Sequence, residues 1–111
     1  MKIERIEASQ YRIPVTIPLR ENPRYIDVVL TRVETDTGLQ GFSVTDVYGP
    51  ALAAMINEEV APYLRGANPL ETERIWNDLY TTFNIRCLTG LWSSMVSMID
   101  IALWDIKGKH F

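Results

Sequence analysis

The sequence predicts an α+β fold in which a three-stranded antiparallel sheet is followed by a three-helix bundle. The first half is rich in Ile, Val, Tyr and Thr and is interrupted by turn residues, as strands are. The second half carries apolar residues three and four positions apart, the period of an amphipathic helix. The 111 residues form one domain, residues 1–111, and are too few for a catalytic β/α barrel, which needs roughly 250 residues.

The predicted strands run from Lys2 to Val15, Ile26 to Thr35 and Leu39 to Tyr48. The second and third form a hairpin through Asp36-Thr37-Gly38, because Asp initiates turns and Gly accepts a positive φ. The first strand pairs beside them. The link from Pro14 to Tyr25 is longer than a hairpin requires, and long loops on compact domains are usually functional or mobile.

The first predicted helix opens at Gly49-Pro50, and Pro62 is expected to kink or fray its last turn. The second begins with Asn68 as N-cap, Pro69 at the first helical position and Glu71 reaching back. Their expected apolar faces comprise Leu52, Ile56, Val60, Tyr63 and Leu64 in the first helix and Ile75, Trp76, Leu79 and Phe83 in the second.

The third predicted helix, Leu91 to about Lys109, is apolar on most of its circumference. Its main apolar face comprises Trp92, Met95, Val96, Ile99, Ala102, Leu103 and Ile106, while Met98, Ile101 and Trp104 project elsewhere. A side chain such as Trp104 left in water forgoes roughly 1.5–3 kcal/mol. We therefore expect a partner on this helix, either another domain or another subunit. The alternative is that the first two helices enclose it.

Composition argues against a nucleic-acid-binding, membrane-spanning or disulfide-stabilised protein. The net charge of −3 and the lack of a basic stripe argue against a nucleic-acid partner. No apolar run is long enough for a membrane span, and the charged N-terminus is not a signal peptide. Cys87 is the single cysteine, so an intramolecular disulfide is excluded, and we expect a cytoplasmic location. The Cys87 side chain is expected to be a structural thiol.

Several stretches resemble the enolase superfamily, and most closely its mandelate racemase and muconate lactonizing branch. Thr35-Asp36-Thr37-Gly38-Leu39-Gln40-Gly41 matches the first hairpin, and Tyr48-Gly49-Pro50-Ala51-Leu52 resembles the start of the first helix. The long helix matches over Ile99 to Lys109, preceded by Thr89-Gly90-Leu91. The resemblance covers essentially the whole chain. It departs at Phe42-Ser43-Val44, where many relatives have Trp-Gly-Glu, and this leaves the subgroup and the substrate open.

The resemblance implies that the chain is the N-terminal capping domain of a parent enzyme. Such enzymes abstract the proton α to a carboxylate and hold the enediolate on a divalent ion, usually Mg²⁺, as racemases, cycloisomerases or acid-sugar dehydratases. Their base and metal ligands lie on barrel strands, so no catalytic or metal-ligating residue is expected here and the isolated chain should be inactive. The alternative is a stand-alone binding module. A homo-oligomer is expected.

The family also implies where substrate contacts lie. The loop after the first strand and the end of the third close over the barrel mouth, which here are Pro14 to Ile26 and Asp46 to Pro50. Arg20 and Arg24 are candidates for binding a small carboxylate or acid sugar, because guanidinium groups bind oxyanions bidentately. Tyr48 would form a wall of the pocket. The alternative is that the two arginines only keep the loop soluble.

Other ionisable residues fit structural roles. Lys107-Gly108-Lys109 repeats the family's Lys-x-Lys base, but here it ends a helix and complements the helix dipole. His110 is expected to be exposed. Asp100 and Asp105 point to different sides and do not converge on a metal, while Asp105 is expected to pair with Lys109.

Overall fold

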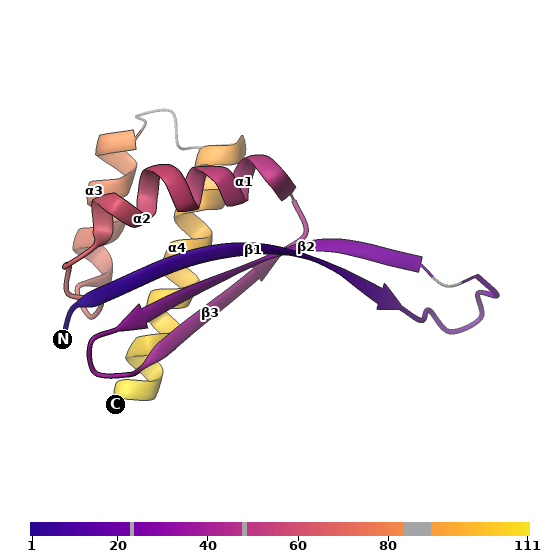
Figure 1. The fold of residues 1–111 in the computed structure, drawn as a ribbon, viewed down its shortest axis with the longest axis horizontal. Helices are drawn as coiled ribbons and strands as arrows, with labels where there is room; N and C mark the ends of the chain where they lie inside the picture. The colour runs from indigo at the N-terminus through magenta and orange to yellow at the C-terminus, as the bar shows by residue number, and fades with distance from the viewer. Residues whose placement is uncertain (23, 48, 84–89) are drawn as a thin grey trace.

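The computed structural model describes residues 1–22, 24–47, 49–83 and 90–111. Three strands come first, and they are β1 (Ile3–Val15), β2 (Arg24–Thr35) and β3 (Gln40–Thr45). The helical half contains α1 (Gly49–Met55), the π-helical η1 (Ile56–Val60), α2 (Ala61–Leu64), α3 (Thr72–Phe83) and α4 (Gly90–His110). Figure 1 shows the helices gathered around one end of the sheet, and it confirms the predicted order of strands followed by helices.

The sheet is antiparallel with the order β1-β2-β3. β1 pairs with β2 out to Val15 and Arg24, whereas β3 pairs with β2 only as far as Val29. Residues 11–15 and 24–28 therefore form a two-stranded extension, here called the hairpin arm, which projects beyond the helices (Figure 1). The predicted link from Pro14 to Tyr25 was wrong at both ends, because Pro14 pairs with Tyr25 inside the ladder. A proline is tolerated there because β1 is an edge strand.

The turn between β2 and β3 forms as predicted. Gly38 has φ +88°, and the Thr35 N–H donates to the Leu39 carbonyl at 2.9 Å. The third strand is shorter than predicted and ends at Thr45. Tyr48, the predicted end, lies outside the described residues, as do Cys87 and Thr89.

The expected irregularity at Pro62 takes the form of a π-turn. In η1 the Ala61 N–H bonds the Ile56 carbonyl, five residues earlier, one residue before the proline that has no N–H to donate. Asn57 in this turn binds the β1 backbone, accepting from the Ala8 N–H at 2.8 Å and donating to the Ala8 carbonyl at 2.9 Å. Tyr63, predicted to be core, is instead half-exposed, and its hydroxyl lies 3.1 Å from that of Thr82 on α3.

The second long helix begins later than predicted. Asn68 accepts a hydrogen bond from the Leu70 N–H at 3.0 Å and so caps a turn, while α3 itself starts at Thr72. Of its expected apolar face, Ile75 and Leu79 are buried, but Trp76 is 43% exposed and stacks on Tyr80. α3 packs mainly on α4, so only part of its expected apolar face is covered.

The core lies between the sheet and the helices α1 and α4. Gly41 of β3 is required here, since a Cβ would overlap the Ala102 carbonyl oxygen and lie 2.7 Å from Ile106 Cγ1. This close approach buries Met98, which was predicted to lie off the main apolar face. Its carbonyl accepts a hydrogen bond from Ser43 Oγ at 2.7 Å. The fully buried hydrophobic side chains include Ile3, Val29, Val33, Leu52, Ile56, Leu79, Met95, Ile99, Leu103 and Ile106.

One side of α4 remains uncovered within the described part of the chain. Ile101 and Trp104 are 50% and 53% exposed. The alternative in which the first two helices enclose α4 is therefore wrong for these two side chains. Across the described residues, none of the helices combines the length and apolarity that a membrane span requires.

Candidate functional site

The hairpin arm has two chemically different faces. Side chains alternate along a strand, so Gln10 and Arg12 of β1 share with Asp27 of β2 the face that is buried further along the sheet at Ala8 and Val29. We call this polar face the inner face of the arm. The opposite, outer face is apolar and carries Tyr11, Ile13, Ile26 and Val28, and it continues onto the three-stranded part of the sheet at Leu30 and Val44.

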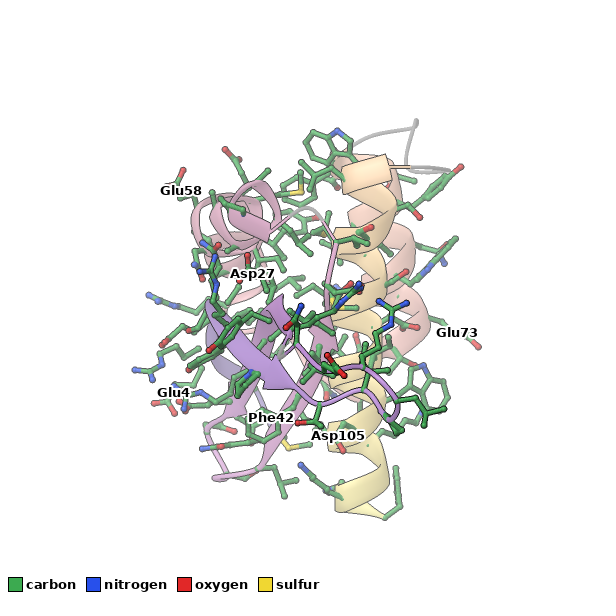
Figure 2. All side chains as sticks on the ribbon, turned by 90° about the vertical axis from the view of Figure 1, so that its right-hand side faces the viewer. Glu4, Asp27, Phe42, Glu58, Glu73 and Asp105 are labelled. Carbon is green, nitrogen blue, oxygen red and sulfur yellow. The ribbon has the colours of Figure 1, made fainter. Side chains whose placement is uncertain are left out.

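The inner face contains an ion pair between Arg12 and Asp27. Arg12 Nε lies 2.9 Å from Asp27 Oδ1, and the two residues are directly opposite each other in the ladder. The hydrogen bond between them raises the pKa of Arg12 and lowers the pKa of Asp27, and the attraction between the two charges adds a smaller effect in the same directions. Both side chains are exposed, so the pair presents a charged, pre-oriented guanidinium to the solvent (Asp27 is labelled in Figure 2).

The base of the arm meets the start of the first helical segment. A Cβ placed on Gly49 would lie 3.8 Å from Gln10 Oε1, so the Gln10 side chain is adjacent to the connection between β3 and α1. Gly49, in the segment Asp46 to Pro50, thus lies beside the base of the arm, whereas the segment Pro14 to Ile26 forms the outer end of the arm (Figure 1).

Two of the three predicted site residues lie within the described part of the chain. Arg20 lies in the loop at the tip of the arm, where its N–H donates to the Ile17 carbonyl at 3.2 Å and its side chain is exposed. Arg24 begins β2, and the alternation of the strand places it on the opposite face from Asp27. Tyr48 is outside the described residues. The structure therefore does not bring Arg24 together with the inner face.

Sequence reasoning missed Arg12 and Gln10. Both lie in the strand predicted from Lys2 to Val15, but no functional role was predicted for them because no register between the first two strands was predicted. The missing signal was the pairing of Arg12 with Asp27, which becomes visible once the ladder is extended to Val15 and Arg24.

The outer face of the arm is an apolar surface. Tyr11, Ile13 and Val44 are 52%, 43% and 56% exposed, and with Val28 and Leu30 they line an open hollow of about 360 Å³. Contiguous exposed apolar surface of this kind marks a contact site in soluble proteins.

The described residues do not form a metal site. No group of three or more His, Cys, Asp or Glu side chains is placed to hold an ion in the described part of the chain. Mg²⁺ needs several oxygen ligands around one point, so the residues present do not fit this ion. The terminal lysines have structural partners, with Lys109 Nζ 3.0 Å from Asp105 Oδ2, as predicted, and 2.7 Å from the Gln40 carbonyl.

A short sheet with helices on one face and a projecting hairpin defines an α+β domain of the enolase N-terminal type. The chain belongs to the family "Mandelate racemase / muconate lactonizing enzyme, N-terminal domain", whose model matches residues 4–111. This family is part of the enolase superfamily, as the motifs of the sequence indicated.

Individual relatives support the same assignment. The chain is 30% identical over 113 residues to 3,6-anhydro-alpha-L-galactonate cycloisomerase of Streptomyces coelicolor, covering 96% of this chain and 31% of the relative. It is 34% identical over 110 residues to D-galactonate dehydratase of Verminephrobacter eiseniae, and the match covers 98% of this chain and 25% of the relative. The structure of a racemase from Streptomyces coelicolor with bound magnesium matches with a TM-score of 0.78 and 30% identity, and the match covers 96% of this chain and 32% of the racemase chain. The chain thus spans about a quarter to a third of the length of these relatives.

Proposed function

We propose that this domain is the cap of a Mg²⁺-dependent enolase-superfamily enzyme that abstracts the proton α to a carboxylate. The family assignment supports this, as do the cycloisomerase, dehydratase and racemase activities named for its relatives. In the parent enzyme a barrel domain would supply the base and the ligands of Mg²⁺, and the ion would supply the positive charge that such a reaction requires. The cap alone has no activity.

The hairpin arm is the observation that carries the proposal. It extends beyond β3 and the helices, with a polar inner face and a loop bearing Arg20 at its tip (Figure 1). An arm of this shape closes over a site on a neighbouring domain, excludes water and thereby strengthens the electrostatic interactions inside. Arg20 and Arg12 offer guanidinium groups to a small carboxylate or an acid sugar. Arg24 and Tyr48 are further candidates for this contact.

The proposal is tested with the complete reading frame of the parent enzyme, assayed on a panel of sugar acids. We expect Arg20→Ala to lower kcat/KM by about 10- to 100-fold, the effect of one charge-assisted hydrogen bond. The matched control is Arg5→Ala, since Arg5 is also exposed but pairs with Glu7 and Glu34 far from the arm. Equal activity of both variants, or turnover by the isolated 111-residue chain, would contradict the proposal.

A second candidate function is self-association without catalysis. The apolar outer face of the arm favours it, because Val44 and Tyr11 are more than half exposed there. In this case we expect sedimentation equilibrium to give an oligomer that Val44→Lys converts to a monomer. A monomeric wild-type chain at micromolar concentration would reject this candidate and leave the cap function intact.

A further inference from the structure

A groove between α3 and α4 combines aromatic and acidic side chains. It is an open hollow of about 340 Å³ lined by Thr72, Glu73, Trp76, Asn77, Asp100 and Trp104. We call it the tryptophan groove. α3 contacts α4, and Figure 2 shows Glu73 projecting outward from α3 on the side of α4 away from the sheet. The groove is therefore separate from the hairpin arm.

The charge of the groove is one-sided. Its two carboxylates, Glu73 and Asp100, have no salt bridge to any described residue, and no Lys or Arg lines it. An adjacent hollow shares Thr72, Glu73 and Trp104 with the groove and is also lined by Arg74 and Lys107. Cations therefore lie next to the groove but outside its lining, and Lys107 Nζ is 4.6 Å from the centroid of the Trp104 ring.

Asp100 is held in an unfavourable environment. Partial burial raises the pKa of its carboxyl, and the Trp104 indole N–H offsets this only in part. A carboxylate that is partly desolvated without a cationic partner is stabilised when a cation is brought beside it. Trp76 and Trp104, which are 43% and 53% exposed, add the ring faces to which such a cation is attracted.

The size of the groove restricts its occupant. A hollow of about 340 Å³ is at the lower end for small ligands and suits one long side chain better than a helix. On α4 the exposed positions Ser97, Ile101, Trp104 and Gly108 continue the surface beside it along one helical seam. A protein surface that packs on this seam places a side chain directly into the groove.

We propose that the tryptophan groove is a docking site for an arginine or lysine side chain from the remaining polypeptide of the parent enzyme. The cation pairs with Asp100 and Glu73 and lies against the rings of Trp76 and Trp104. The contact also covers Ile101, which explains why this side of α4 is apolar. The identity of the partner surface rests on the proposed function, whereas the chemistry of the groove does not.

The test uses the 111-residue chain and two small probes, N-acetyl-argininamide and the neutral isostere N-acetyl-citrullinamide. We expect the argininamide to shift the indole N–H resonances of Trp76 and Trp104 in a saturable manner at millimolar concentration. Trp92 provides an internal reference, because it packs on Phe83 outside the groove. Asp100→Asn should weaken binding about tenfold, whereas the control Asp78→Asn, which alters a carboxylate paired with Arg74, should not.

Three results would overturn the proposal. These are equal shifts with the citrullinamide, no shift at about 100 mM argininamide, or unchanged affinity in Asp100→Asn. A concentration-dependent shift without any probe would assign the groove to a second copy of the chain instead. Since none of these measurements involves turnover, a negative result leaves the cap function untouched, and an inactive parent enzyme leaves the groove result valid.

Discussion

Asp105 of α4 accepts a hydrogen bond from the backbone N–H of Phe42 of β3 at 2.9 Å, across 63 residues of sequence. The same carboxylate oxygen lies 3.0 Å from Lys109 Nζ, and Figure 2 shows Phe42 and Asp105 next to each other. β3 is an edge strand, so its outward N–H groups have no strand partner. Asp105 satisfies one of them and ties the end of α4 to the sheet.

We expect Asp105→Ala to lower the free energy of unfolding by about 1 kcal/mol at pH 7, near the low end for a charged hydrogen bond because the carboxylate is partly exposed. The hydrogen bonds from Lys109 and then Phe42 hold the pKa of Asp105 below its ordinary value of 3.8. A lowered pKa in the folded state stabilises the fold above pH 3.8, and this stabilisation is lost as the pH falls through the lowered value. Urea unfolding at pH 7 and pH 3 measures both effects. An equal loss of unfolding free energy in Asp105→Ala at pH 7 and at pH 3 would contradict this account.

Gly41→Ala should be among the most damaging single substitutions in the chain. The added methyl would overlap the backbone of α4 at Ala102, so β3 and α4 must separate. We expect a loss of about 3 kcal/mol or more, or failure to fold. Gly108→Ala is the matched control, because a Cβ there meets nothing within 4 Å and the position is helical. The control should be neutral or stabilising by up to about 1 kcal/mol. Thermal unfolding followed by circular dichroism distinguishes the two.

Asn57→Ala should release the π-turn from β1. The substitution leaves the Ala8 N–H and carbonyl without the side chain that binds both. We expect a loss of about 2–3 kcal/mol in unfolding free energy. Hydrogen exchange provides a local measurement, since the Ala8 amide should become less protected. Glu58→Ala, at the exposed neighbouring position, should change neither quantity, and comparable effects in both variants would show that η1 itself is fragile.

Asp100→Asn should not destabilise the isolated chain. Partial burial raises the pKa of Asp100 above its ordinary value of 3.8, which means that the folded state disfavours the charged carboxylate. The carboxylate therefore lowers the free energy of unfolding progressively as the pH rises from 3.8 through the raised pKa. Removing the charge should therefore keep or increase the unfolding free energy at pH 7, by less than about 1 kcal/mol. Denaturation across pH 3 to 7 measures this. A clear loss of stability in Asp100→Asn would indicate that the carboxylate already has a cationic partner in the chain, in addition to the Trp104 indole N–H.

Much of this architecture follows from local sequence. The turn at Gly38, the apolar spacing along α4 and the irregularity before Pro62 depend on residues a few positions apart, and all three were predicted. The error in the link has a non-local cause. Pro14 to Tyr25 was predicted to be a link, whereas the pairing of Pro14 with Tyr25 and of Val15 with Arg24 extends the ladder through both ends of that segment.

The candidate sites were less accessible to sequence reasoning. Arg20 lies in the loop after the first strand, as predicted, and its role in binding remains a prediction. Arg12 gained significance only through Asp27, and the tryptophan groove only through the approach of α3 to α4. Trp76 illustrates the difficulty, since its spacing on the helix matches the core positions while its ring remains 43% exposed.

The sequence by itself determined the strands, the helices, the turn at Gly38 and the family, because periodicity and turn chemistry act between near neighbours in the chain. Only the tertiary structure decided which faces are covered. Gly41 against Ala102, Asp105 on Phe42 and Trp104 beside Trp76 are contacts between distant residues, and their geometry depends on how the whole chain packs. A helical spacing specifies that a face exists, whereas burial depends on whether another element lies against it.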